Sequence, residues 1–238
     1  MRTGNGDTAF PSKKNARVPV PWRVQDVISF CFVLALYFLM GLQFRHASRY
    51  LAGRYLLIKP LFVYLLFDIV SIFICFYILK RMMTKYKDGW ALLFRSSLNR
   101  KYLILSIVIG LLLGLFNSLF YSYRFPNTAA IPYERVTFYV LLLYGILIAP
   151  VTEEVWFRSF VFRGIRNKYG VLVGLIGSVL LFLLWHLSNF QALNVVIFGF
   201  VVTIFYETTD SLYGCMVIHA TNNFVFLIFR QFYFVLFQ

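Results

Sequence analysis

Seven long runs of apolar residues are the feature that most limits how this chain can fold. The runs lie at about 27–44, 61–79, 102–121, 136–149, 171–187, 192–206 and 212–229. A helix needs about 20 mostly apolar residues to cross the hydrocarbon of a bilayer, and fewer where it borders a polar cavity. The runs therefore predict an all-α fold, a polytopic bundle of about seven transmembrane helices, with six and eight as the neighbouring counts.

Composition agrees with this fold class and argues against a soluble one. Of the 238 residues, 61% are hydrophobic and 13% are charged, whereas a soluble domain has roughly 45–50% apolar and about 25% charged residues. The net charge of +14 does not indicate nucleic acid as a partner, because the basic residues lie mostly between the apolar runs. Lysine and arginine in such segments set the orientation of a membrane protein. The expected partner is the lipid bilayer itself.

The distribution of Lys and Arg predicts how the chain is oriented. Segments on the same side as the N-terminus carry more than twice as many basic residues as those on the other side, and the side richer in positive charge is cytoplasmic. We expect a basic cytoplasmic tail over residues 1–26 and one transmembrane domain over 27–238. The chain is then a multi-pass protein of the plasma membrane, and a turn at Arg163–Lys168 faces the cytoplasm. Its short loops are typical of a bacterial protein.

Three ionisable side chains are predicted to reach similar depths below that cytoplasmic surface. Glu153 precedes the turn by about 11 residues, roughly 16 Å along a helix, and His219 is roughly 11 Å into the last span. His186 is roughly 24 Å along its own span, and less deep if that helix tilts. We therefore expect one polar cavity, open to the cytoplasmic side and lined by a catalytic core of about 136–230.

An alternative places the acidic segment APVTEEVWFRSF at the membrane surface. Pro150 is a natural start or kink of a helix, so residues 152–166 could form an amphipathic helix with its carboxylates in water. Against this, apolar residues surround that helix too completely for a surface position. Burial is the favoured interpretation.

Helical spacing separates the two neighbouring glutamates. Glu154 and Arg158 are four residues apart on one face, which predicts an ion pair. Glu153 points about 100° away from that pair. Ionisable groups inside a membrane usually face the bundle interior and mark function, and an unpaired carboxylate there is suited to activate water as a general base.

Two histidines each have a polar or aromatic residue one helical turn away. Phe182 precedes His186, and Asn223 follows His219. A carboxylate, two imidazoles and an amide together could polarise a water, hold an oxyanion and protonate a leaving amine, as amide hydrolysis requires. Glu153, His186 and His219 could equally ligate a divalent metal such as zinc, whose bound water attacks.

The order of these residues resembles a known family signature. The three motifs are Glu153-Glu154-x-x-x-Arg158, Phe182-x-x-x-His186 and His219-x-x-x-Asn223. Together they resemble the CPBP family, the CAAX prenyl endopeptidases and bacteriocin-processing (Abi) membrane proteases, over roughly 144–226. Each motif alone is short, but all three in order at helical spacing are specific.

The resemblance implies an intramembrane endopeptidase. In such a protease Glu153 and His186 activate water. His219 and Asn223 stabilise the oxyanion, while Glu154, Arg158 and Phe182 support the site. A strict His-Glu-x-x-His zinc motif is absent from the sequence, which favours catalysis without a metal and implies no firm cofactor.

The expected substrate is a hydrophobic or lipid-associated peptide. It could be a bacteriocin or pheromone precursor, or a peptide whose cleavage serves self-immunity. A second hypothesis is a non-catalytic immunity or scaffold protein that binds a peptide or sensor partner in the same cavity. A third, an ion-coupled transporter, is disfavoured because the chain shows no paired inverted halves. The sequence does not specify the oligomeric state.

Overall fold

All regular structure that the chain shows is helical. The computed structural model describes residues 20–54, 60–126, 135–186 and 192–237, and these ranges contain helices only. In chain order they are α1 Val24–Arg54, α2 Pro60–Met83, α3 Gly89–Leu93, α4 Arg100–Arg124, α6 Arg135–Leu143, η1 Tyr144–Ile148, α7 Ala149–Glu154, η2 Val155–Phe162, α8 Arg163–Tyr169, α9 Val171–Trp185, α10 Ala192–Thr209 and α11 Leu212–Phe237. The predicted all-α class is confirmed. Most of the predicted basic tail, residues 1–19, lies outside the described residues.

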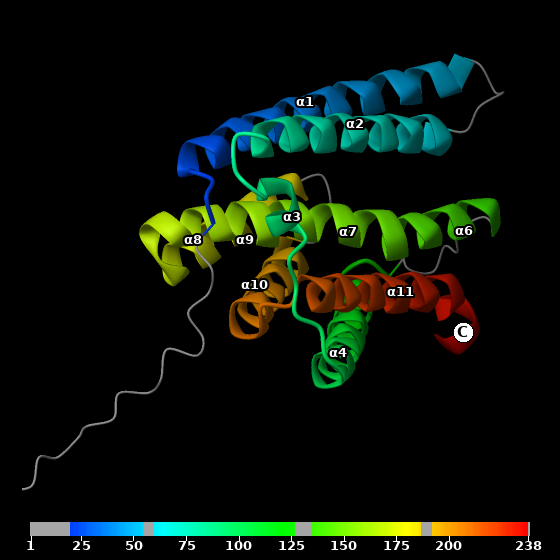
Figure 1. Cartoon of the computed structure of the whole chain (residues 1–238). Helices are drawn as coiled ribbons and strands as arrows, with labels where there is room; N and C mark the ends of the chain where they lie inside the picture. The colour runs from blue at the N-terminus through cyan, green and yellow to red at the C-terminus, as the bar shows by residue number, and fades with distance from the viewer. Residues whose placement is uncertain (1–19, 55–59, 127–134, 187–191, 238) are drawn as a thin grey trace, which may run out of the picture.

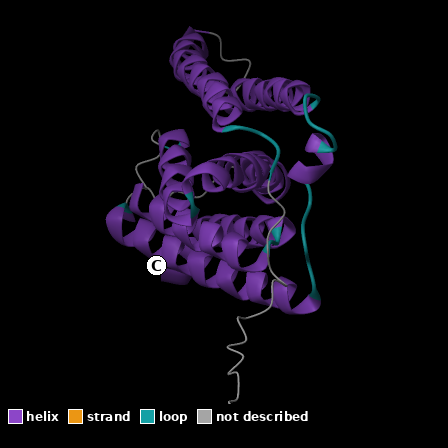
Figure 2. Cartoon of the chain, turned by 60° about the vertical axis from the view of Figure 1, so that its left-hand side comes forward, coloured by secondary structure: helices purple, strands orange, loops and turns teal. Residues whose placement is uncertain are grey.

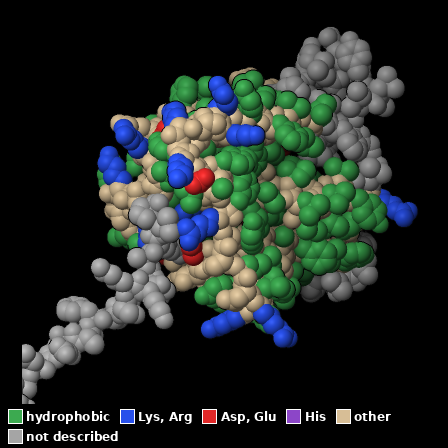
Figure 3. Space-filling model, in the orientation of Figure 1, with side chains coloured by type: hydrophobic (Ala, Val, Ile, Leu, Met, Phe, Trp, Pro, Cys, Tyr) green, Lys and Arg blue, Asp and Glu red, His purple; other side chains and the backbone are tan. Residues whose placement is uncertain are grey.

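Several of these helices are long and apolar enough to cross a membrane. Within the described ranges there are five: Val24–Gly41, Arg100–Arg124, Thr137–Tyr169, Ala192–Thr209 and Leu212–Phe232. α9 is a shorter apolar helix, and the predicted run at 61–79 falls in α2. Apolar side chains cover much of the face that Figure 3 shows, as expected of a surface that faces lipid. The fold is a polytopic helical membrane bundle, as predicted.

A central helical rod organises the bundle (Figure 1). It runs without a break from α6 to α8, with α1 and α2 on one side and with α4 and α11 on the other. The view in Figure 2 shows the same separation of the α1–α2 pair from the rest. Aromatic side chains fill the seam with α1, where the ring of Phe30 lies 5.9 Å from that of Trp156 and 5.3 Å from that of Phe160.

The rod passes through two π-helical segments, η1 and η2, and places the acidic segment inside the protein. Every residue of η2 is buried, which confirms burial over the surface-helix alternative. The predicted turn at Arg163–Lys168 is wrong, because those residues form α8 and the chain reverses only at Gly170. Gly170 has φ +87°, a conformation that residues with a Cβ rarely adopt, so the glycine fixes where the rod ends.

α4 and α11 pack unusually closely. A Cβ added at Gly110 would lie 2.6 Å from Cβ of Thr221, and one added at Gly114 would lie 2.6 Å from Cβ of Val225. Glycines four residues apart let two membrane helices approach until their backbones almost touch. This contact brings polar side chains of α4 against the part of α11 that carries His219 and Asn223.

Candidate active site

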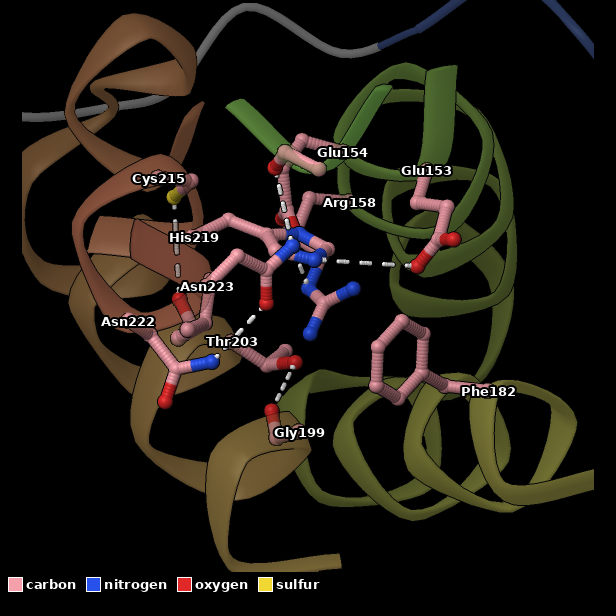
Figure 4. A network of polar contacts seen from close by, with 12 residues as sticks. Glu153, Glu154, Arg158, Phe182, Gly199, Thr203, Cys215, His219, Asn222 and Asn223 are labelled. Carbon is pink, nitrogen blue, oxygen red and sulfur yellow. Dashed lines mark hydrogen bonds and ion pairs between the residues drawn. The ribbon is translucent and has the colours of Figure 1, made fainter. Parts of the chain in front are cut away.

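Glu154 lies at the centre of a buried polar cluster (Figure 4). Its Oε2 is 3.1 Å from Nε of Arg158, and both side chains are fully buried. Its Oε1 is 2.7 Å from Nδ1 of His219. The ion pair expected from the spacing is therefore present, and the same carboxylate also holds a histidine from α11.

The contact with Glu154 determines how His219 presents its ring. A carboxylate only accepts hydrogen bonds, so Nδ1 of His219 carries the proton and donates it. Nε2, the other ring nitrogen, then points at Glu153, 3.9 Å from Oε2 of that residue. Carboxylate–histidine pairs of this kind fix the ring orientation and stabilise an imidazolium when one forms.

Glu153 faces a second histidine, which follows the last residue of α9. Nε2 of His186 is 3.6 Å from the same Oε2 atom, and Nδ1 of His186 lies 2.9 Å from the carbonyl oxygen of Phe182. Because a carbonyl accepts, Nδ1 donates, and in the neutral ring Nε2 is an acceptor. The carboxylate oxygen and this nitrogen are therefore two hydrogen-bond acceptors that face each other. Among the described residues, Glu153 Oε2 has no hydrogen-bond donor.

Asn223 lies one helical turn after His219 on α11. Its Nδ2 donates to the carbonyl oxygen of Gly145 at 2.9 Å, and its Oδ1 accepts from Nδ2 of Asn222 at 3.1 Å. An added Cβ at Gly145 would be 3.6 Å from Cβ of Asn223, so the rod passes close to this side chain. The predicted oxyanion residue is thus anchored between two helices.

Aromatic rings pack against the polar cluster. The Arg158 guanidinium lies 4.5 Å from the centre of the Phe182 ring, and that ring is 4.4 Å from the ring of His186. Phe198 of α10 was not singled out by the sequence, yet its ring is 4.8 Å from that of His219. Nothing in the local sequence distinguishes Phe198 from the many other phenylalanines of the chain. The rings keep the ion pair in an apolar surrounding, where its attraction is strong.

The structure brings together all seven side chains singled out from the sequence, which come from the central rod, α9 and α11. Glu153, His186 and His219 meet as the depth argument expects. The sequence did not reveal the bond from Glu154 to His219, because it joins helices that are distant along the chain.

One of the same three side chains lies farther from Glu153 than zinc ligands lie from each other. Ligands at about 2.0–2.2 Å from a tetrahedral zinc lie about 3.3–3.6 Å apart. Nε2 of His186 is 3.6 Å from Glu153 Oε2, which is within this range, whereas Nε2 of His219 is 3.9 Å from it. In the part of the chain that the structure describes, no group of three His, Cys, Asp or Glu residues is arranged to hold a metal ion. No chemical step is therefore assigned to a metal.

Comparison with known proteins agrees with the motifs. Residues 135–225 match the family model described as type II CAAX prenyl endopeptidase Rce1-like, which confirms the family resemblance seen in the sequence. The match covers the rod, α9, α10 and part of α11, and leaves α1 to α4 outside it. No curated protein and no solved structure matches the chain.

The buried ion pair predicts a large difference between two matched arginine substitutions. Arg158→Met leaves Glu154 buried without its cation, which should lower the free energy of unfolding by about 3–5 kcal/mol. Arg166→Met removes a similar pair, Nε to Glu207 Oε2 at 2.9 Å, whose side chains are 27% and 22% exposed, and should cost about 0–1 kcal/mol. Denaturant titration of both variants in mixed micelles measures the difference. Equal losses of unfolding free energy in the two variants would show that the buried Glu154–Arg158 pair matters no more for stability than the partly exposed Arg166–Glu207 pair.

Proposed function

We propose that this Rce1-like chain is an intramembrane endopeptidase, which hydrolyses a peptide bond in a hydrophobic or lipid-associated peptide. The observation that carries the proposal is the arrangement around the buried Glu153, whose carboxylate faces Nε2 of both the buried His219 and the partly exposed His186. The match of residues 135–225 to a family of endopeptidases supports the same class of reaction.

Glu153 and His186 form the half of the site that activates water. Two acceptors 3.6 Å apart are too far from each other for a direct hydrogen bond, but a single water can donate one proton to each. In that position the water has its lone pair free to attack a carbonyl carbon. Glu153 takes up one proton as the O–C bond forms, which is general-base catalysis.

His219 and Asn223 form the half that holds the oxyanion. When His219 is an imidazolium, its Nδ1–H donates to Glu154, and its Nε2–H is available to donate a hydrogen bond to the oxyanion. Asn223 Nδ2 has two N–H groups, of which one is bonded to Gly145. The negative charge of Glu154 stabilises the imidazolium at the moment when the substrate carbonyl becomes negative.

The reaction ends with a proton transfer from the same glutamate. When the tetrahedral intermediate collapses, the C–N bond breaks and the proton taken from water moves from Glu153 to the departing amine nitrogen. The second proton of the attacking water passes through His186 to the released amine, so the products are a carboxylate and an ammonium. Glu153 and His186 return to their starting states.

The surroundings of the site indicate the class of substrate. The cluster lies among apolar helices, so a peptide must carry enough apolar surface, or an attached lipid, to reach it. The family name refers to prenylated CAAX peptides, which fit this requirement. A bacteriocin or pheromone precursor, or a peptide met in self-immunity, satisfies the same chemistry and is the substrate that we propose.

The basic end of the molecule supports the orientation that we propose in the plasma membrane. Lys and Arg side chains gather at the end where α8 lies (Figure 3), and we assign this end and the N-terminus to the cytoplasm. Two exposed tyrosines, Tyr169 at this end and Tyr123 near the other, are 51% and 87% exposed.

In a cysteine-free background, a membrane-impermeant maleimide should label Tyr123→Cys in intact cells and Tyr169→Cys only after lysis. The reverse pattern would invert the assignment.

Loss of the Glu153 carboxylate should block processing of one peptide in cells. Comparative peptidomics of wild type, Glu153→Ala and His186→Ala strains is expected to show one uncleaved precursor accumulating in both variants, while each protein remains in the membrane. Glu207→Ala, which removes a carboxylate paired with Arg166 outside the cluster, serves as the matched control and should process normally. If the Glu153→Ala strain behaves as wild type, a non-catalytic immunity or scaffold protein is the better account.

A further inference from the structure

A buried asparagine of α4 lies in a chain of amides that ends at the active site. Asn117 is 8% exposed, and its Nδ2 donates to Oδ1 of Asn222 at 2.6 Å. Nδ2 of Asn222 donates to Oδ1 of Asn223, and Nδ2 of Asn223 donates to the carbonyl oxygen of Gly145. Asn117 lies outside residues 135–225, which match the family model.

The direction of this chain is fixed at its far end. A carbonyl oxygen can only accept, so the amide group of Asn223 must turn its nitrogen, not its oxygen, toward Gly145. The oxygen of Asn223 then needs a donor, which is the nitrogen of Asn222, and the oxygen of Asn222 in turn needs the nitrogen of Asn117. The Gly145 carbonyl thus sets the orientation of all three amides, and each hydrogen bond between them adds to the cost of turning one of them over.

The backbone of the rod explains why the Gly145 carbonyl is available. In η1 the N–H of Ala149 bonds to the carbonyl of Tyr144, five residues back. The residue that would donate to Gly145 in this register is Pro150, which has no N–H. Pro150 thus leaves the Gly145 carbonyl to the side chain of Asn223.

Close packing of α4 holds Asn117 at the other end. Gly110 and Gly114 lie against residues 218–225 of α11, so close that an added Cβ at Gly114 would be 2.9 Å from the carbonyl oxygen of Asn222. Asn117 follows Gly114 by three residues and is therefore on the same side of α4. A polar side chain here meets Asn222 directly.

We infer that Asn117 is a positioning residue, which acts through Asn222 to hold Asn223 with its Nδ2 toward the oxyanion. The inference rests on the proposed function, since it assigns a purpose to the orientation of the oxyanion donor. If Asn223 turned over, it would present an oxygen to the oxyanion, and the interaction would become repulsive. Asn117, from a helix that carries none of the three motifs, adds to the cost of this rotation, because Asn222 could turn over together with Asn223 only by giving up the bond from Asn117.

Kinetics of the full-length protein in lipid nanodiscs test the inference. The probe is an internally quenched peptide that ends in a farnesylated Cys-aliphatic-aliphatic-X sequence. Loss of a single oxyanion donor lowers kcat by about 10²–10³-fold, so Asn117→Leu should lower kcat by roughly 10–100-fold, with KM little changed. Asn117→Gln retains an amide donor and should recover part of the rate.

A neighbouring serine is the matched control. Ser118 is also buried, but its hydroxyl donates to the Gly114 carbonyl of its own helix, so Ser118→Ala should leave kcat unchanged. In an Asn223→Ala background, Asn117→Leu should cause no further loss, because the group that it orients is gone. Unchanged kcat in Asn117→Leu, or additive losses in the double variant, would overturn the inference.

A second measurement does not depend on activity or on the folding of a variant. In wild-type protein labelled with ¹⁵N-asparagine, the side-chain amide protons of Asn117 and Asn222 should show a nuclear Overhauser contact. Absence of this contact overturns the amide chain. If wild-type protein leaves the probe uncut, the proposed function fails for prenylated peptides. The nuclear Overhauser contact between Asn117 and Asn222 then remains as the test of whether the amide chain exists.

Discussion

The position of His219, and with it the approach of this histidine to Glu153, depends on one fully buried carboxylate, that of Glu154. A charge in this position is strongly unfavourable unless it is paired and hydrogen-bonded. The chain provides both partners, Arg158 one helical turn away at 3.1 Å and His219 from α11 at 2.7 Å. Because the carboxylate needs both, it ties the central rod to α11 and sets the ring of His219, whose second nitrogen then faces Glu153. The placement of His219 in the catalytic arrangement that we propose is therefore a consequence of satisfying a buried charge.

The backbone contributes as much as the side chains. The rod shifts into the π register at η1, and Pro150 then frees the Gly145 carbonyl, which anchors Asn223. Glycines of α4 allow that helix to touch α11 next to the same side chain. The two halves of the site thus have separate supports: Glu154 orients His219, and an amide chain orients Asn223. Such supports matter because catalysis requires donors held in place before the charge develops.

Much of this architecture was predictable from periodicity and depth. Apolar runs identified the helices, four-residue spacing identified the Glu154–Arg158 pair, and counting along the helices brought Glu153, His186 and His219 together. Contacts across helices were not predictable, because no local pattern encodes which face of α4 or α10 meets α11. Asn117 and Phe198 were missed for this reason. The turn was placed too early because the basic residues of α8 are typical of a loop, whereas Gly170 alone ends the helix.

The central claim is that Glu153 performs chemistry and does not merely help to bind a peptide. Its most direct test is to measure binding and cleavage of one precursor peptide by purified wild-type and Glu153→Gln proteins, side by side. Glutamine keeps the size of the side chain but is not a base. The account predicts that Glu153→Gln binds the peptide as wild type does and cleaves it at least about 10²-fold more slowly, as expected for loss of a general base. Cleavage at the wild-type rate, or loss of binding in parallel with loss of cleavage, would contradict it.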